Sequence, residues 1–391
     1  MKFQEILQTA LEKGASDVHL KVGVPPILRI DGILRALKEA PRLSPEMTKE
    51  MADLVMSEHQ KARFKDTNEI DISYAVSGLG RFRVNVFMQR GSISLALRAI
   101  PHKIPTVEEL LLPRVIEKLA VERRGLVLVT GTTGSGKSTT LAAMVNHINT
   151  YRNAHVITIE DPIEFLHRDK KSIINQREVG QDTNAFNNAL RVALRQDPDV
   201  ILVGEMRDLE TIETAIMAAE TGHLVMSTLH TLDATETINR IIAVFPPFQQ
   251  EQIRLQLAAV IKGVISQRLM PKSDGIGRVP AVEVLVATAR VREYIIDKNR
   301  TKEIGEAIAE GHVQYGMQTF DQSLMALLSQ NLITYEEALN QATNPDDFAL
   351  KYSGVSSTSD TTWDNFTAGE GAEKGEGGLE INQGETGFEW E

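Results

Sequence analysis

The sequence predicts an α/β protein in which a phosphate-binding domain with a parallel sheet follows a small α+β domain. Three observations predict this fold. Near-continuous apolar runs recur between helical stretches after about residue 115. A glycine-rich segment ending in lysine and serine lies between one such run and a helical stretch. The first hundred residues contain short strand-like runs separated by turn signals.

The first domain is expected to open with an amphipathic helix, because its apolar residues follow helical spacing. These residues are Phe3, Ile6, Leu7, Ala10 and Leu11. Apolar runs broken by Pro25-Pro26 and Asp31-Gly32 then predict strands. These strands are expected at 18–22, 27–30 and 33–37. Residues 44–64 are expected to form a helix.

Residues 81–89 alternate in side-chain type, which is typical of a half-buried strand. One face carries Phe82, Val84, Val86 and Met88, and the other carries Arg81, Arg83, Asn85 and Phe87. Another strand is expected over 94–100. Prolines at 101 and 105 then indicate a linker, and Thr106 and Glu109 have the spacing of a capping box.

The second domain is expected to contain a parallel sheet that is buried on both faces, because its strands are almost entirely apolar. The strands are expected at 126–130, 156–160, 200–204 and 224–228. Helices are expected to dominate from 248 to about 342. Few apolar residues follow Ser353, so the tail is expected to be disordered. The predicted divisions are 1–102 for the N-terminal domain, 103–115 for a linker, 116–350 for the parallel-sheet domain with C-terminal helices, and 351–391 for an acidic tail.

The amino-acid composition excludes several classes of protein. Of the 391 residues, 42% are hydrophobic and 24% charged, as in ordinary globular proteins. The net charge of −11 argues against nucleic-acid binding by overall charge. The chain has no cysteine, which excludes disulfides and thiolate metal sites. It has neither an apolar run of the ~18 residues that span a bilayer nor a signal-peptide core at its start. A cytoplasmic location is therefore expected.

A segment of nine residues matches the phosphate-loop pattern G-x-x-x-x-G-K-[ST] between a predicted strand and a predicted helix. The residues expected to bind nucleotide are Gly131, Thr132, Thr133, Gly134, Ser135, Gly136, Lys137, Ser138 and Thr139. Lys137 is expected to bridge the β- and γ-phosphates of ATP, and Ser138 to hold Mg²⁺. A chance match is the alternative, and the flanking strand and helix argue against it.

Hydrolysis also needs a carboxylate that activates the attacking water. Glu160 and Glu205 stand at the ends of two predicted strands, where ligands of α/β sheets bind. Glu205 is the expected catalytic base, and a solvated strand-end carboxylate is the alternative. Gly204 stands where an aspartate usually ligates the metal. Mg²⁺ is therefore expected on Ser138, with Glu160 and Glu205 acting through water.

Two histidines flank the predicted strand 224–229. Histidine can sense a γ-phosphate or link neighbouring sites, so His230 is a candidate catalytic residue and His223 a further candidate. A purely structural role is the alternative for both.

Several long segments resemble the secretion and type IV pilus motor ATPase family, in its retraction branch of the PilT/PilU type (GspE/PilT family). The segment Leu194–Asp208 resembles the signature of that family. The Asp and His boxes of the family resemble Ile157–Phe165 and Gly222–His230. Shorter matches are Ser16–Leu20, Arg29–Gly32 and Gly316–Gln322. The resemblance covers about residues 1–350.

The resemblance implies a homo-hexameric ring, with a PAS-like N-terminal domain and a RecA-like ATPase domain in each subunit. It also implies ATP and Mg²⁺ as cofactors. Arg81 and Arg83 match the family in this region, and they are expected to reach the phosphates of a neighbouring subunit and neutralise transition-state charge. A solvated strand face is the alternative. Arg98 and Arg195 are weaker candidates.

The direction of the motor rests on two features. Extension motors of the family usually carry a cysteine zinc site and additional N-terminal domains, whereas this chain has no cysteine and starts almost directly at the PAS-like domain. The resemblance therefore implies pilus retraction and twitching motility, with an inner-membrane platform protein (PilC-like) as partner and a peripheral position on that membrane. Residues 290–297 depart from the retraction motif at several positions, so an accessory, PilU-like motor stays open.

Two further alternatives remain open. A RecA-like nucleic-acid motor shares the ATPase pattern, but the chain has no basic run with interleaved aromatic residues. A scaffold that binds ATP without turnover is the other alternative, and the presence of Lys137, Ser138 and Glu205 argues against it.

Overall fold

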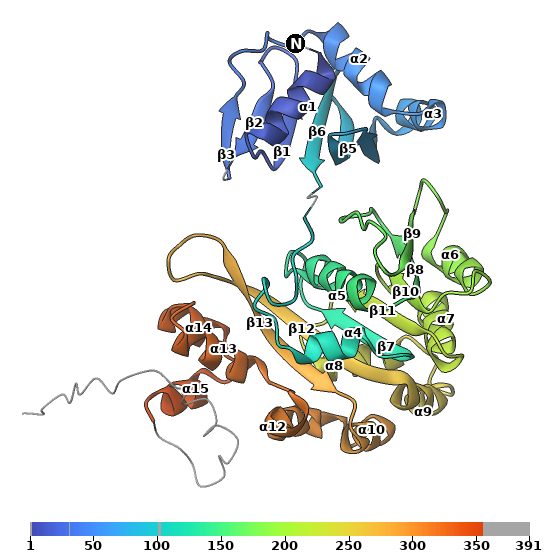
Figure 1. Ribbon diagram of the computed structural model, residues 1–391, viewed down its shortest axis with the longest axis vertical. Helices are drawn as coiled ribbons and strands as arrows, with labels where there is room; N and C mark the ends of the chain where they lie inside the picture. Colours follow the sequence, from blue (N-terminus) through green and yellow to red (C-terminus); the bar gives the residue numbers. More distant parts are fainter. Residues whose placement is uncertain (1, 31, 101–102, 355–391) are drawn as a thin grey trace, which may run out of the picture.

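The computed structural model describes residues 2–30, 32–100 and 103–354, which fold into two domains, each with its own sheet (Figure 1). The N-terminal sheet has six strands in the order β3-β2-β1-β6-β5-β4. The second sheet has seven strands in the order β13-β12-β7-β11-β10-β8-β9. Each domain is therefore organised around a separate core.

The N-terminal sheet is antiparallel throughout. Its strands are β1 (Asp17–Leu20), β2 (Ile27–Ile30), β3 (Ile33–Ala36), β4 (Glu69–Val76), β5 (Gly80–Gln89) and β6 (Ser92–Ala99). Its helices are α1 (Phe3–Glu12), α2 (Pro45–Val55) and α3 (Glu58–Thr67). Alternation along β5 buries Phe82, Val84 and Val86 in the core of this domain, whereas Met88 is exposed. The arginines of β5 therefore lie on the face opposite to that core.

The helix expected over 44–64 is two helices. Ser44 accepts a hydrogen bond from the Met47 amide and so caps α2. The backbone is extended at Met56, and Ser57 caps α3 through a capping box with Gln60. A second helix start within the segment divides it, because an N-cap residue adopts a non-helical backbone.

The second sheet is parallel from β12 to β9, and β13 is its antiparallel edge. Its strands are β7 (Gly125–Thr130), β8 (His155–Glu160), β9 (Ile173–Glu178), β10 (Val200–Val203), β11 (Leu224–Leu229), β12 (Ile261–Pro271) and β13 (Arg278–Val286). Both faces of the sheet are buried: Leu126 and Leu128 of β7 belong to one core cluster, and Val127 and Val129 to the other. The predicted parallel sheet with two covered faces is confirmed.

Helices cover both faces of this sheet (Figure 1). The helices that precede β12 are α4 (Val115–Ala120), α5 (Lys137–Tyr151), α6 (Phe186–Ala193), α7 (Leu209–Glu220), α8 (Ala234–Ala243) and α9 (Gln250–Val260). Helices α4 and α5 pack on one face, and α6 to α9 on the other. The helices after β13 are α10 (Ala289–Ile296), η1 (Thr301–Glu303), α11 (Ile304–Glu310), α12 (His312–Tyr315), α13 (Phe320–Ser329), α14 (Tyr335–Gln341) and α15 (Pro345–Tyr352).

The expectation that helices dominate from 248 to 342 is wrong at β12 and β13. Helix α9 ends at Val260 and β12 begins at Ile261, so no glycine, proline or turn marks the change. A continuous apolar stretch that crosses such a junction cannot be divided by its pattern alone. The strand forms because β7 and β13 pair with it on both sides.

The segment between the domains contains no helix or strand within its described part, 103–114. Thr106 and Glu109 exchange the two hydrogen bonds of a capping box, but the residues that follow form a turn, and α4 begins only at Val115. The expected tail begins inside α15, which continues to Tyr352. Its remainder from 355 lies outside the described residues, as do the predicted turn residue Asp31 and Pro101 of the linker. Among the described helices, none is both long and apolar enough to cross a bilayer.

Glu283 on β13 gives a pH-dependent stability prediction. Burial raises the pKa of this carboxyl to about 7, although it accepts a hydrogen bond from the Ala234 amide. The folded chain therefore binds more protons than the unfolded chain between pH 4.5 and 7, and the free energy of unfolding falls as pH rises through this range. Glu283→Gln is expected to raise the free energy of unfolding by about 2–3 kcal/mol at pH 8 and little at pH 4.5.

Urea titrations at the two pH values measure this effect, and Glu306→Gln, on an exposed side chain, is the matched control. An equal change at both pH values would show that ionisation of Glu283 does not limit stability.

Candidate functional site

The phosphate loop connects β7 to α5 at the carboxyl end of the parallel sheet. Gly131 has φ of 138°, and a Cβ there would lie 2.4 Å from the Gln267 carbonyl oxygen. Only glycine fits this position. Gly136 is left-handed at the N-cap of α5, so the first amides of a 15-residue helix open toward the loop. Such a helix start binds phosphate through its amides and its dipole.

Backbone carbonyl groups of the phosphate loop hold the side chain of Lys137 in place. Its Nζ donates to the carbonyl oxygens of Gly131 at 2.8 Å and Thr132 at 2.9 Å. Burial lowers the pKa of Lys137, and the carboxylates of Glu205 and Glu164 partly oppose this shift. The ammonium group is therefore placed beside both the loop and the acidic side of the site.

Strand β12, which sequence reasoning missed, supports the loop from behind. The Ser266 hydroxyl accepts a hydrogen bond of 2.9 Å from the Thr130 hydroxyl. The side-chain Nε2 of Gln267 donates to the Ser135 carbonyl oxygen at 3.5 Å. The loop is thus fixed between β7 and its neighbour in the sheet.

One cavity of about 640 Å³ unites most of the predicted residues. Its lining includes Glu160 at the end of β8, Glu205 just after β10, and His230 just after β11. Six of the nine predicted phosphate-loop residues also line it, and the other three, Gly131, Thr132 and Ser135, do not. Parallel strands explain this gathering, because their carboxyl ends meet at one edge of the sheet.

Glu205 is held by two basic side chains. Its carboxylate lies 2.6 Å from the Arg207 guanidinium and 3.2 Å from His230 Nε2. Burial alone would raise the pKa of Glu205, but Arg207 and His230 outweigh burial and hold it below its usual value. Glu205 is therefore ionised at neutral pH and able to accept a proton.

Glu160 lies in a different environment. Burial raises its pKa, and hydrogen bonds from Thr158, Gln176 and the Glu164 backbone oppose this shift. Thr158 and Gln176 donate to the same carboxylate oxygen, at 2.7 and 3.1 Å. The two carboxyl groups of the cavity thus have pKa values displaced in opposite directions, which is a common property of acid–base sites.

The two histidines lie at opposite ends of β11. The backbone of His223 pairs with Gly125 at the start of β7, and its Nδ1 bonds to the Ala218 carbonyl oxygen. Six residues of strand, about 20 Å, separate it from the cavity end of the sheet. The expectation that His223 lies beside the nucleotide is therefore wrong, because it precedes its strand while ligands bind where strands end.

The N-terminal arginines divide into two groups. Arg83 and Arg98 line the cavity of their own chain, with 45% and 71% of their side chains exposed. Arg81 does not line this cavity; it is bound to Glu178. Two arginines of the same chain therefore line this cavity, and the supply of an arginine by a neighbouring subunit stays a prediction. Arg195 is exposed and lies outside the cavity lining.

Other lining residues were missed. His167 is neutral at pH 7, because burial lowers its pKa to about 4. Leu269 and Arg278 enter from the β12–β13 hairpin. Leu269 and Arg278 could have been predicted from the sequence only by recognising that residues 261–286 form a β-hairpin. Arg207 could have been found, since it follows Glu205 by two residues.

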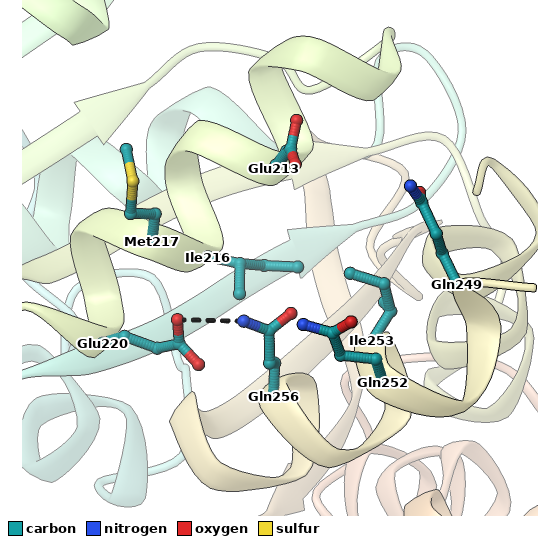
Figure 2. A pocket seen from close by; sticks show the side chains of 8 residues that line it. All are labelled: Glu213, Ile216, Met217, Glu220, Gln249, Gln252, Ile253 and Gln256. Atoms are coloured by element: carbon teal, nitrogen blue, oxygen red, sulfur yellow. Dashed lines mark hydrogen bonds between the residues drawn. The ribbon is translucent and has the colours of Figure 1, made fainter. Parts of the chain in front are cut away.

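A second hollow, of about 290 Å³, lies between α7 and α9 (Figure 2). Gln249, Gln252 and Gln256 line one side, and Gln256 donates to Glu220 at 3.2 Å. No lysine or arginine is among its described lining residues. It is therefore unsuited to a triphosphate, and the nucleotide site is assigned to the larger cavity.

The fold and the family of this chain follow from comparison with known proteins. Residues 2–313 match the family described as type II/IV secretion system protein. The chain belongs to this family. A solved structure of the pilus retraction motor PilT with bound ADP superposes with a TM-score of 0.82 and is 50% identical, over 89% of this chain and 98% of that one. The predicted fold class, a RecA-like α/β domain after a PAS-like α+β domain, is confirmed for this secretion system protein.

Curated relatives agree with the structural match. The type IV pilus retraction ATPase PilT of Pseudomonas aeruginosa is 45% identical over 348 residues, which cover 89% of this chain and all of the relative. The type IV pilus ATPase PilU of the same organism is 43% identical over 350 residues, 90% of this chain and 91% of the relative. The solved structure of the Legionella pneumophila ATPase DotB is 28% identical, with a TM-score of 0.75, over 90% of this chain and 95% of that one.

Proposed function

We propose that this chain is the ATPase of a type IV pilus retraction motor. The observation that carries the proposal is one cavity that combines the second half of the phosphate loop, including Lys137 and Ser138, with Glu160, Glu205 and arginines of the N-terminal domain. The relatives named as retraction ATPases match along most of the chain, which supports the same activity here. Hydrolysis in this cavity would change its contacts with the N-terminal domain and so convert chemistry into domain motion.

The residues divide the chemistry among them. The loop amides and Lys137 bind the β- and γ-phosphates, and Glu205 accepts a proton from the attacking water. As the water oxygen bonds to the γ-phosphorus, the bond to the β–γ bridging oxygen breaks, giving ADP and phosphate. Arg83 and Arg98 neutralise the charge that develops on the transferred group.

Mg²⁺ fits this site, where the Ser138 hydroxyl would hold it beside the phosphates of the nucleotide. Among the described residues, no group of three or more histidines and carboxylates is arranged to hold a metal alone. Mg²⁺ commonly takes few protein ligands and binds through substrate phosphates and water. Bound there, it would supply positive charge at the phosphates, with Glu160 and Glu205 acting on its water ligands.

We also propose that six copies form a ring that acts on a platform protein at the cytoplasmic face of the inner membrane. Both points follow from the family resemblance, and the fit of residues 2–313 to the secretion family supports them. A nucleic-acid motor is disfavoured by the net charge of −11.

Deletion of the gene, with live imaging of labelled pili, tests the function. Cells are expected to extend pili normally and to lose most retraction events, because extension would use a separate motor. Cells without pili would contradict the proposal and assign this chain to extension. Normal retraction in the deletion strain would assign it an accessory role.

A further inference from the structure

Glu178 forms a contact between the two domains. It is the last residue of β9 and pairs in register with Glu160 of β8, so the two carboxyl-bearing residues lie on neighbouring strands. Only 3% of the Glu178 side chain is exposed. Its own amide donates to Asp182 at 2.8 Å, which fixes the backbone at this point.

Three donors converge on one oxygen, Oε2 of Glu178. The Arg81 guanidinium lies at 2.6 Å and the Ser73 hydroxyl at 2.8 Å, and both come from the N-terminal domain. The Ile163 amide donates at 3.1 Å and belongs to the loop that follows Glu160. One carboxylate therefore joins the N-terminal domain to a loop of the nucleotide site.

Because the Glu178 carboxylate is buried, its hydrogen bonds depend on the position of the N-terminal domain. Only 16% of the Arg81 side chain is exposed, so the ion pair with Glu178 is shielded from water on both sides. A buried carboxylate that loses its cation must find water or another donor. Withdrawal of Arg81 and Ser73 would therefore turn Glu178 away and release the Ile163 amide.

The loop 161–164 connects the Glu178 contact to the nucleotide cavity. Asp161, Pro162 and Glu164 line the cavity on either side of Ile163, whose side chain is buried. The Glu164 backbone lies near the Glu160 carboxylate and favours its ionised form. One loop thus binds Glu178 through the Ile163 amide and brings the next residue, Glu164, beside Glu160, so displacement of the Ile163 bond would disturb the surroundings of Glu160.

We propose that Glu178 is a positioning residue that makes the orientation of Glu160 depend on docking of the N-terminal domain. The inference rests on the proposed ATPase function. It assigns Arg81 a role within its own chain, as the docking partner of Glu178, in place of contact with phosphate. Hydrolysis is then favoured only in chains whose two domains are engaged.

The test compares Arg81→Met, Glu178→Gln and the double variant in the full chain. Each single change is expected to lower kcat about tenfold, since small misplacement of a reacting group has large effects. The Kd of a fluorescent ADP analogue is expected to stay within about twofold, because the phosphate loop is untouched. The double variant is expected to match the singles, because both remove one link.

Gln181→Ala is the matched control. The Gln181 side chain also crosses to the N-terminal domain, donating to the Ser73 carbonyl at 3.3 Å, but it does not contact the Glu178 side chain. This variant is expected to keep the wild-type kcat. Ser73→Ala removes one hydroxyl donor to Glu178 and leaves the Arg81 ion pair in place. It is therefore expected to lower kcat only about threefold. This variant tests the contact by a milder change if Glu178→Gln folds poorly.

Hydrogen exchange at the Ile163 amide gives a readout that does not need turnover. Exchange is expected to accelerate in Arg81→Met and in Glu178→Gln, and not in Gln181→Ala. Unchanged exchange in Arg81→Met, or additive losses of kcat in the double variant, would overturn the inference. An inactive wild-type enzyme would contradict the proposed function instead, and the exchange result would still decide the role of Glu178.

Discussion

Glu205→Gln is expected to lower kcat by about 10²–10⁴-fold, the usual contribution of a general base. The substitution keeps the size of the side chain and one of its two acceptor oxygens, and it removes the ionised carboxylate that accepts the proton. ADP binding is expected to persist, since the loop and Lys137 are unchanged. Steady-state phosphate release and titration with a fluorescent ADP analogue measure the two quantities.

The pH dependence of wild-type kcat sharpens this prediction. The pKa of Glu205 lies below its usual value because Arg207 and His230 outweigh the effect of burial. Glu205 is therefore expected to remain an active base as the pH falls to about 5. Glu213→Gln, which changes a carboxylate of the hollow between α7 and α9, is the control and is expected to leave kcat unchanged. Equal turnover by wild type and Glu205→Gln would refute catalysis by this residue.

Arg83→Ala is expected to lower kcat by on the order of 10³-fold, as removal of a charge-neutralising arginine does in other phosphoryl-transfer sites. Its guanidinium lines the cavity together with the phosphate loop. Arg278→Ala is the contrasting variant, because Arg278 enters beside Leu269, which approaches the Gly136 side of the loop. It is expected to raise the Kd of ATP and ADP alike while kcat changes little.

Mixing of two inactive variants decides whether Arg83 acts within its own chain. Arg83→Ala chains retain Glu205, and Glu205→Gln chains retain Arg83. If the arginine acts within one chain, mixed assemblies are expected to stay inactive. Recovery of a substantial fraction of wild-type kcat on mixing would show that a neighbouring subunit supplies the arginine, as the sequence analysis expected.

Local sequence patterns were enough to predict much of the fold and of the site. The phosphate loop, Glu160 and Glu205 were predictable, because a motif and the ends of apolar strands are local features that the parallel sheet brings together. Strands β12 and β13 were not, since β12 pairs with β7 across more than a hundred residues and β13 pairs in turn with β12. Arg278 and Leu269 were missed for the same reason.

The role of Arg81 shows a second limit of sequence. Arg81 and Arg83 lie on one face of one strand, and alternation could not distinguish them. Their different environments follow from domain docking, which places Glu178 against Arg81 and the nucleotide cavity beside Arg83. A contact between distant segments of this kind leaves no periodic signal in either segment.

The direct junction of α9 and β12 has a consequence for engineering of this chain. No loop separates Val260 from Ile261, and the pairing of β12 with β7 already shifts between Ile261 and Gly263. A residue inserted beyond this irregularity would slip the rest of the strand by one position. Such a slip turns every side chain of β12 to the other face of the sheet, and Gln267 would leave the phosphate loop. Peptide tags belong instead in the turn 272–277, where Ile276 is exposed and glycines at 275 and 277 already permit unusual backbone angles.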